Sequence, residues 1–155
     1  MTSFSRLIFS LILVAWSGTA LAGDVAQNLG AGNVAIKGYD PVAYQTQNAA
    51  VQGSDAFVAE HNGATYHFAS AANRDAFQAS PEKYAPAFGG YCAMGVAFGK
   101  KFDVEPTAFR VVDGTLYLNL NSDVQSRWLQ DVPGNLEKAS SNWPEIADKA
   151  PVDLR

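Results

Sequence analysis

The fold is decided by the stretch Ala56-Phe57-Val58-Ala59-Glu60-His61-Asn62-Gly63-Ala64-Thr65-Tyr66-His67-Phe68. Two strand-like runs flank Asn62-Gly63, a dipeptide that tolerates the positive φ angles of a two-residue type I′ turn. The same pattern returns over residues 109–119, where Asp113-Gly114 separates the two runs. The sequence therefore predicts two tight antiparallel β-hairpins.

Three helices are predicted between and after these hairpins. Ser70 can accept hydrogen bonds from the free N–H groups of a helix over residues 71–78, which Pro81 ends. Two more helices are expected over residues 122–131 and 134–142. Pro133 interrupts the pattern between them, and the expected core contacts are Leu129, Leu136 and Trp143. The predicted fold class is α+β, a single small domain with antiparallel β-hairpins packed against short α-helices.

A short proline motif occurs three times, at residues 40–44, 80–84 and 105–109. In each case a residue that can cap a helix precedes the proline, and an aromatic residue follows three positions later. Because proline is preorganised for the first position of a helix, each motif predicts one short helical turn that places an aromatic ring in the core. No longer internal repeat is seen in the sequence.

The first 22 residues have the features of an export signal. Arg6 precedes an apolar stretch over residues 7–16, which is too short to span a bilayer, and Ala20-Leu21-Ala22 offers the small residues of a cleavage site. We therefore expect cleavage after Ala22 and a periplasmic or secreted product. The alternative is a retained N-terminal anchor, which no cluster of Lys and Arg supports.

The mature chain is expected to form one domain. Residues 23–33 are small and polar and predict a flexible lead-in, and residues 34–155 form the domain itself. No later segment is expected to cross a membrane. With 48% hydrophobic and 17% charged residues, the composition is that of a globular protein.

The charge of the chain bears on its partners. The formal net charge is −4, with 11 basic and 15 acidic residues, and loss of Arg6 with the signal makes the balance more negative. This acidity argues against nucleic acid and anionic membrane surfaces as partners. A metal ion, a small molecule or a periplasmic partner protein is compatible with it.

Five short motifs follow one another along the chain, and together they resemble a known family. They are residues 37–44, 62–74, 81–86, 89–93 and 114–119. In this order they are similar to the exported bacterial YHS domain-containing proteins, over about residues 35–143. The resemblance implies a YHS-like domain over residues 34–155.

The resemblance also implies which metal site is missing. Related metal-sensing domains carry a tyrosine-x-phenylalanine-cysteine pattern with a second cysteine four residues later. The matching positions here are Ala69 and Asn73, neither of which can supply a thiolate. A closed zinc site of that kind is therefore not expected.

Cys92 is the single cysteine of the chain. In an oxidising compartment it cannot form an internal disulfide, so it is buried, joined to another molecule, modified, or used as a metal ligand. Cys92 and Met94 offer the sulfur ligands that favour Cu(I), and His61 and His67 are the only imidazoles. These four residues make up the predicted metal site, with a copper ion as its cofactor.

Each of these residues also has a structural interpretation. A lone cysteine among apolar neighbours is often buried, and methionine often fills a core. His61 lies beside a turn and is expected to be solvated. His67 alternates with Tyr66 and Phe68 on a strand, so it is expected on the other face, toward solvent.

No catalytic motif is found in the sequence, and an enzyme is not expected. A thiol hydrolase would need a histidine and an orienting residue beside Cys92, and no nucleophile motif supports this arrangement. The glycines and lysines of residues 95–101 lack the spacing of a phosphate-binding loop. Cys-x-x-Cys, Cys-x-x-Cys-His and His-Glu-x-x-His motifs are absent.

Two functions of different class remain. The first is a periplasmic metal-binding protein, most plausibly for copper and without catalytic activity. The second is a non-catalytic module that binds a small molecule or a protein through the segment around Tyr91 and Phe98. In the second case Cys92 is buried or forms an intermolecular disulfide. The exposure of Cys92 discriminates between the two functions.

Overall fold

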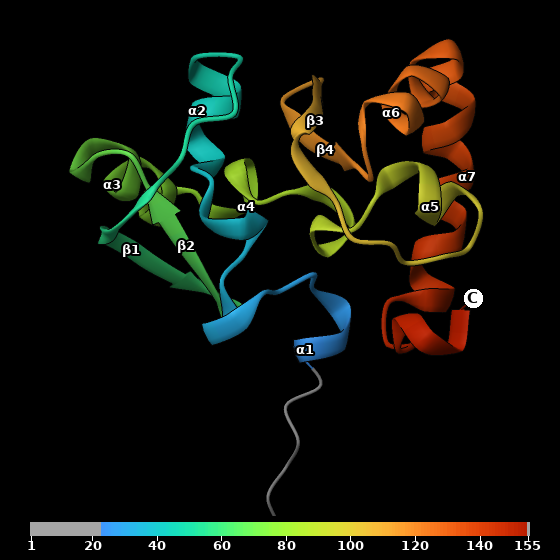
Figure 1. The fold of residues 1–155 in the computed structure, drawn as a ribbon, viewed down its shortest axis with the longest axis horizontal. Helices are drawn as coiled ribbons and strands as arrows, with labels where there is room; N and C mark the ends of the chain where they lie inside the picture. Colours follow the sequence, from blue (N-terminus) through green and yellow to red (C-terminus); the bar gives the residue numbers. More distant parts are fainter. Residues whose placement is uncertain (1–22, 155) are drawn as a thin grey trace, which may run out of the picture.

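The computed structural model describes residues 23–154. The predicted export signal and its cleavage site at residues 1–22 lie outside these residues. The fold is α+β, as predicted, with helices and two antiparallel hairpins that are separate two-stranded sheets (Figure 1). Among the described residues, no helix has both the length and the apolar character that a membrane span needs.

The elements form two sets that follow the same order along the chain. The first set is η2 (Ile36–Gly38), α2 (Pro41–Thr46), β1 (Ser54–His61), β2 (Ala64–Phe68), α3 (Ala71–Ala79) and α4 (Pro81–Tyr84). The second set is η3 (Ala87–Gly90), α5 (Ala93–Ala97), β3 (Glu105–Val112), β4 (Thr115–Asn119), α6 (Ser122–Trp128) and α7 (Val132–Ile146). Short helical segments lie outside or between them: α1 (Gly23–Ala26), η1 (Ala31–Asn33), η4 (Leu129–Asp131) and η5 (Pro151–Leu154).

These two sets are an internal repeat, which we did not find in the sequence. We call residues 35–84 the first repeat and residues 87–136 the second repeat. Strands β1 and β3 each have 8 residues and β2 and β4 each have 5, and both hairpins have a register shift in the first strand. At a nearly constant spacing, the cap Ser70 corresponds to Asn121 and the buried Phe77 to Trp128.

The backbone of the two repeats agrees in detail. Three consecutive residues are left-handed in η2, with φ of 50°, 51° and 82° at Ile36, Lys37 and Gly38. Their counterparts in η3, residues 88–90, have φ of 53°, 59° and 80°. The repeat was missed in the sequence because equivalent positions share geometry more than residue identity.

The predicted hairpins are confirmed. Asn62 and Gly63 have φ of 50° and 80°, and Asp113 and Gly114 have φ of 49° and 77°, as a type I′ turn requires. The Ser70 side chain accepts a hydrogen bond from the Asn73 N–H and caps α3. These local signals were sufficient because each depends on a few neighbouring residues.

Two expectations about proline were wrong. Pro106 does not start a helical turn, because it lies in β3 at the shifted register, where its missing N–H breaks no ladder. Pro133 does not interrupt the chain between helices, because it occupies the first turn of α7, where proline is favoured. One expected core residue, Leu129, is 42% exposed in η4.

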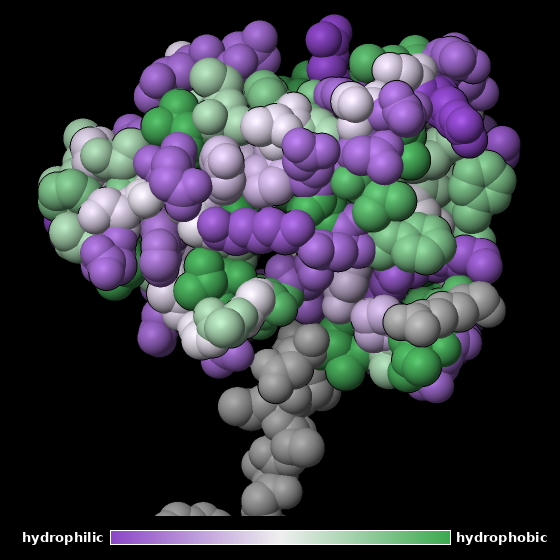
Figure 2. Space-filling model, in the orientation of Figure 1, coloured by the Kyte–Doolittle hydropathy of each residue, from purple (hydrophilic) through white to green (hydrophobic). Residues whose placement is uncertain are grey.

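The main core contains residues from both repeats. Its largest fully buried members include Tyr44, Phe68, Phe77, Leu116 and Leu118. Tyr44 joins the repeats directly, since its ring lies 4.7 Å from that of Phe109 and its hydroxyl donates to the Pro106 carbonyl at 2.9 Å. Around this core, hydrophilic residues are spread over the face of the molecule that Figure 2 shows.

Residues 25–33 differ from the flexible lead-in expected from composition. The Asn28 N–H donates to the Gly89 carbonyl at 2.8 Å. Lys101, which is buried, donates to the carbonyls of Val25, Ala147 and Lys149 at 2.8, 2.6 and 2.8 Å. The start of the described chain is therefore attached both to the second repeat and to the region after α7.

The turn glycines give a test of the hairpins. We expect Gly63→Val and Gly114→Val each to lower the free energy of unfolding by about 1–3 kcal/mol. No atom would lie within 4 Å of an added Cβ at either position, so the cost comes from the positive φ alone. Chemical denaturation measures it, and unchanged stability in both variants would contradict the type I′ turns.

Candidate functional site

Cys92 lies in the core, with 1% of its surface exposed. It caps helix α5, and its sulfur accepts hydrogen bonds from the N–H groups of Gly95 at 3.4 Å and Leu120 at 3.2 Å. The thiol also lies 3.8 Å from the Asn119 Oδ1 atom. The sulfur is therefore already used as an acceptor within the protein.

The first repeat has an aspartate at the position of Cys92. The carboxylate of Asp40 caps α2 by accepting from the Val42 and Ala43 N–H groups at 2.9 and 3.3 Å. Its other oxygen accepts from the Ala69 N–H at 2.8 Å and from Asn73 Nδ2 at 2.7 Å. Ala69 corresponds to Leu120. Asp40 and Cys92 therefore each connect the start of a helix to the residue that follows the hairpin of the same repeat.

The surroundings of Cys92 keep its thiol protonated. Burial raises the pKa of Cys92, and the N–H groups of Gly95, Leu120 and Met94 lower it by less. Because the pKa is raised, the thiolate that binds metals is disfavoured at neutral pH. Met94 is half-buried at the start of the same helix.

The two histidines lie in the first repeat, on opposite faces of its hairpin. His61 is paired with Ala64 and lies on the face of Tyr66, whereas His67 is paired with Val58 and lies on the other face. Both histidines were expected to face solvent, but both are half-buried. His67 lies close to Gly38, where an added Cβ would be 3.4 Å from its Nδ1 atom.

The predicted copper ligands therefore do not form one site. One imidazole at most could face a given ion, and the Cys92 sulfur is enclosed and hydrogen-bonded. Among residues 23–154, no three His, Cys, Asp or Glu side chains are grouped so that they could hold a metal ion. These residues do not fit the copper site inferred from the sequence.

A cleft does form around His61. It has a volume of about 340 Å³ and is lined by Ala26, Gln27, His61, Asn62, Tyr66, Ala85, Pro86 and Gly89. The hairpin of the first repeat, the connection between the repeats and the N-terminal segment each form one wall. Ala26, Ala85 and Pro86 make part of the lining apolar, whereas the hairpin supplies polar groups.

Tyr66 and His61 are the chemical groups of this cleft. Tyr66 is 3% exposed, its ring packs against Phe77 at 4.6 Å, and its hydroxyl makes no hydrogen bond to the residues that the structure describes. Burial raises the pKa of Tyr66 to about 12, so the hydroxyl stays protonated and can donate to a ligand at neutral pH. The cleft thus combines a free donor with an apolar surface.

His61 is held in place at the edge of the cleft. Its Nε2 atom lies 3.0 Å from Asn62 Nδ2 and 3.8 Å from Glu82 Oε1. When Asn62 donates, Nε2 is the unprotonated nitrogen and Nδ1 carries the proton. The ring also meets Phe77 edge-on at 6.1 Å, so its orientation is fixed by packing as well.

Sequence reasoning selected His61 but missed Tyr66 and Pro86. The alternation along β2 indicated that Tyr66 is buried, yet only the return of the chain after α4 shows that a cleft adjoins it. Of the two residues expected at a binding segment, Tyr91 is buried and Phe98 is 65% exposed. The Tyr91 hydroxyl donates to carbonyl oxygens of the N-terminal segment.

The two capping residues can be compared directly. Cys92→Ala leaves the N–H groups of Gly95 and Leu120 without their acceptor, so we expect a loss of about 1–3 kcal/mol in the free energy of unfolding. Asp40→Ala leaves four donors unpaired and is expected to cost more. Urea denaturation measures both, with Met94→Leu as a control that keeps its volume. A larger loss for Cys92→Ala would contradict this comparison.

Copper binding provides a second test of Cys92. We expect the reduced chain from residue 23 onward and its Cys92→Ser variant to have equal Cu(I) affinity, because the wild-type sulfur is enclosed and its raised pKa disfavours the thiolate. Competition with a Cu(I) chelator under anaerobic conditions measures this affinity, and circular dichroism checks the fold of each variant. Loss of tight binding in a folded Cys92→Ser variant would restore the copper site.

Comparison with protein-family models finds no match to the chain. No curated protein and no solved structure matches it either. The resemblance to exported YHS domain-containing proteins therefore rests on the sequence motifs alone.

Proposed function

We propose that this chain is an exported, YHS-like binding domain without catalytic activity, which holds a small organic molecule in the cleft beside His61 and Tyr66. The observation that carries the proposal is that Tyr66, which is 3% exposed and whose hydroxyl has no hydrogen-bond partner among the described residues, lines a cleft of about 340 Å³. Small-molecule sites have volumes of about 300–1,000 Å³, an apolar lining and a few directed polar groups. The cleft lies at the lower end of this range.

The lining favours one chemical class of ligand. An apolar ring or short chain fits against Ala85 and Pro86, while an oxygen atom of the ligand accepts a hydrogen bond from the Tyr66 hydroxyl. The His61 ring offers a further polar group at the edge of the cleft. A small aromatic carboxylate combines these features and is the probe of choice.

Comparison with the second repeat supports a binding cleft that belongs to the first repeat alone. Tyr117 corresponds to Tyr66, and its ring packs on Trp128 at 5.7 Å as that of Tyr66 packs on Phe77. Phe88 lies 5.9 Å from the Tyr117 ring and 5.8 Å from that of Trp143 in α7. Helix α7 continues well beyond α4, its counterpart, so the second repeat carries additional structure where the first has its cleft.

Benzoate binding tests the proposal. We expect saturation-transfer NMR to detect benzoate on the mature chain, and Tyr66→Phe to weaken binding about 3–10-fold, the equivalent of one hydrogen bond. Tyr117→Phe is the matched control and should bind as the wild type does. The proposal fails if a panel of small aromatic carboxylates does not bind, or if the two variants bind equally.

A further inference from the structure

Residues 25–29, which we call the strap, cross the second repeat and are held through their main chain. The Tyr91 hydroxyl lies 3.1 Å from both the Val25 and the Gln27 carbonyl oxygens and donates to them. Lys101 also donates to the Val25 carbonyl, and the Asn28 N–H donates to Gly89. Because these partners are backbone atoms, recognition here depends little on the side chains of the strap.

Gly89 shapes the floor under the strap. An added Cβ at Gly89 would lie 1.9 Å from the Ala26 carbonyl oxygen, so only glycine allows the strap to approach. The corresponding residue of the first repeat is Lys37, whose side chain instead reaches the Val104 carbonyl at 2.7 Å. The groove for a crossing chain is thus a feature of the second repeat.

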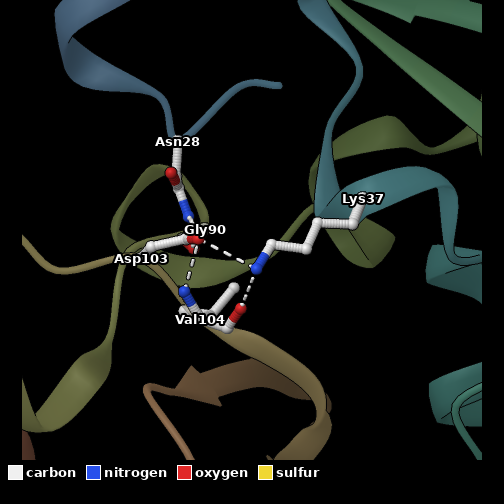
Figure 3. Close-up of polar contacts among 5 residues, drawn as sticks. All are labelled: Asn28, Lys37, Gly90, Asp103 and Val104. Atoms are coloured by element: carbon white, nitrogen blue, oxygen red, sulfur yellow. Dashed lines mark hydrogen bonds and ion pairs between the residues drawn. The ribbon is translucent and has the colours of Figure 1, made fainter. Parts of the chain in front are cut away.

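Two side chains of the strap also anchor it. Asn28 Nδ2 donates to Asp103 Oδ1 at 2.9 Å and to the Gly90 carbonyl at 3.3 Å, and Asp103 pairs with Lys37 at 2.9 Å (Figure 3). Gln27 donates through its Nε2 atom to the Asn62 carbonyl. Both anchors reach groups that remain in place without the strap.

Leu29 is the one strap residue that packs against the main core, and it also forms an antiparallel bridge with Ala35, so release of the strap gives up little packing outside Leu29. All five of its residues are only half-buried, and residues 30–33, which follow it, are exposed. Gly32 has φ of 68° within this exposed segment. A segment with no buried side chain and an exposed connection belongs to the least stable parts of a fold.

The strap separates two hollows. Gln27 lines the His61 cleft and also a cavity of about 410 Å³ on its other side, which Tyr91, Lys101, Phe102 and Pro151 help to line. Without the strap these hollows would join into one groove along the second repeat, with the hairpin of the first repeat at one end. The groove would then present Tyr91, Lys101 and the Gly89 carbonyl to an incoming chain.

We propose that the strap is the internal occupant of a polypeptide-binding groove, and that a short segment of another polypeptide binds there through its main chain when the strap is released. The contacts that would bind this segment are those that now hold Val25, Gln27 and Asn28 by their main chain. Because the strap competes from within the molecule, the apparent affinity for a partner is reduced by the fraction of molecules that are closed.

The test uses a synthetic peptide of residues 23–33 as the probe and the full mature chain as the protein. A Gln27→Ala/Asn28→Ala variant loosens the strap and leaves the groove unchanged. We expect NMR titration, followed at the Trp143 indole near Lys101, to show peptide affinity at least tenfold higher for this variant than for the wild type. A peptide with an N-methyl group on Asn28 lacks the N–H that meets Gly89 and should bind at least fivefold more weakly.

Hydrogen exchange supplies an independent measurement on the unmodified chain. The amides of Asn28 and Asp40 each donate to a backbone carbonyl at 2.8 Å and form a matched pair. We expect Asn28 to exchange at least 100-fold faster than Asp40.

The proposal is overturned if Asn28 exchanges only with global unfolding, if the variant does not bind the peptide, or if the N-methylated peptide binds equally well. The benzoate proposal is tested on the closed wild-type chain with Tyr66→Phe and Tyr117→Phe, so the two proposals fail separately.

Discussion

The buried carboxylate of Asp40 is the interaction on which the arrangement of the first repeat depends. A charge without exposure to water is tolerated only if its hydrogen bonds are complete, and Asp40 accepts four. The donors come from the start of α2, the end of β2 and helix α3. One side chain thereby fixes the position of a helix relative to a hairpin and the helix that follows it.

The second repeat has the same arrangement with a weaker acceptor. The Cys92 sulfur meets two N–H groups where Asp40 meets four, and Asn119 completes the contact by accepting from the Met94 N–H at 3.3 Å. A thiol is neutral when buried, so this repeat avoids the desolvation cost of a carboxylate. The environment that enables Cys92 to cap α5 is therefore the one that makes it a poor metal ligand.

Local features of the fold could be predicted from the sequence, whereas features made by distant residues could not. The turns at Asn62-Gly63 and Asp113-Gly114 and the cap at Ser70 each depend on adjacent residues. The repeat is different, because Ile36 and Phe88 share a left-handed conformation without sharing a residue type. The cleft was missed for a related reason: Tyr66 and Pro86 meet only after the chain has passed through α3 and α4. The residue types of the four candidate ligands could not show where these residues lie relative to one another. In the structure His61 and His67 lie on opposite faces of the first hairpin, and Cys92 is enclosed in the core.

Lys101 has a consequence for the topology of the chain as a whole. Its ammonium group binds carbonyls at both ends of the described chain, Val25 on one side and Ala147 and Lys149 on the other, and the two ends lie near each other in Figure 1. The path of the described backbone is thus nearly a closed ring, because the buried Lys101 side chain holds its two ends together. In such a ring the order of the two repeats along the polypeptide is not fixed by their packing, and a circular permutant that begins between them would preserve the same contacts.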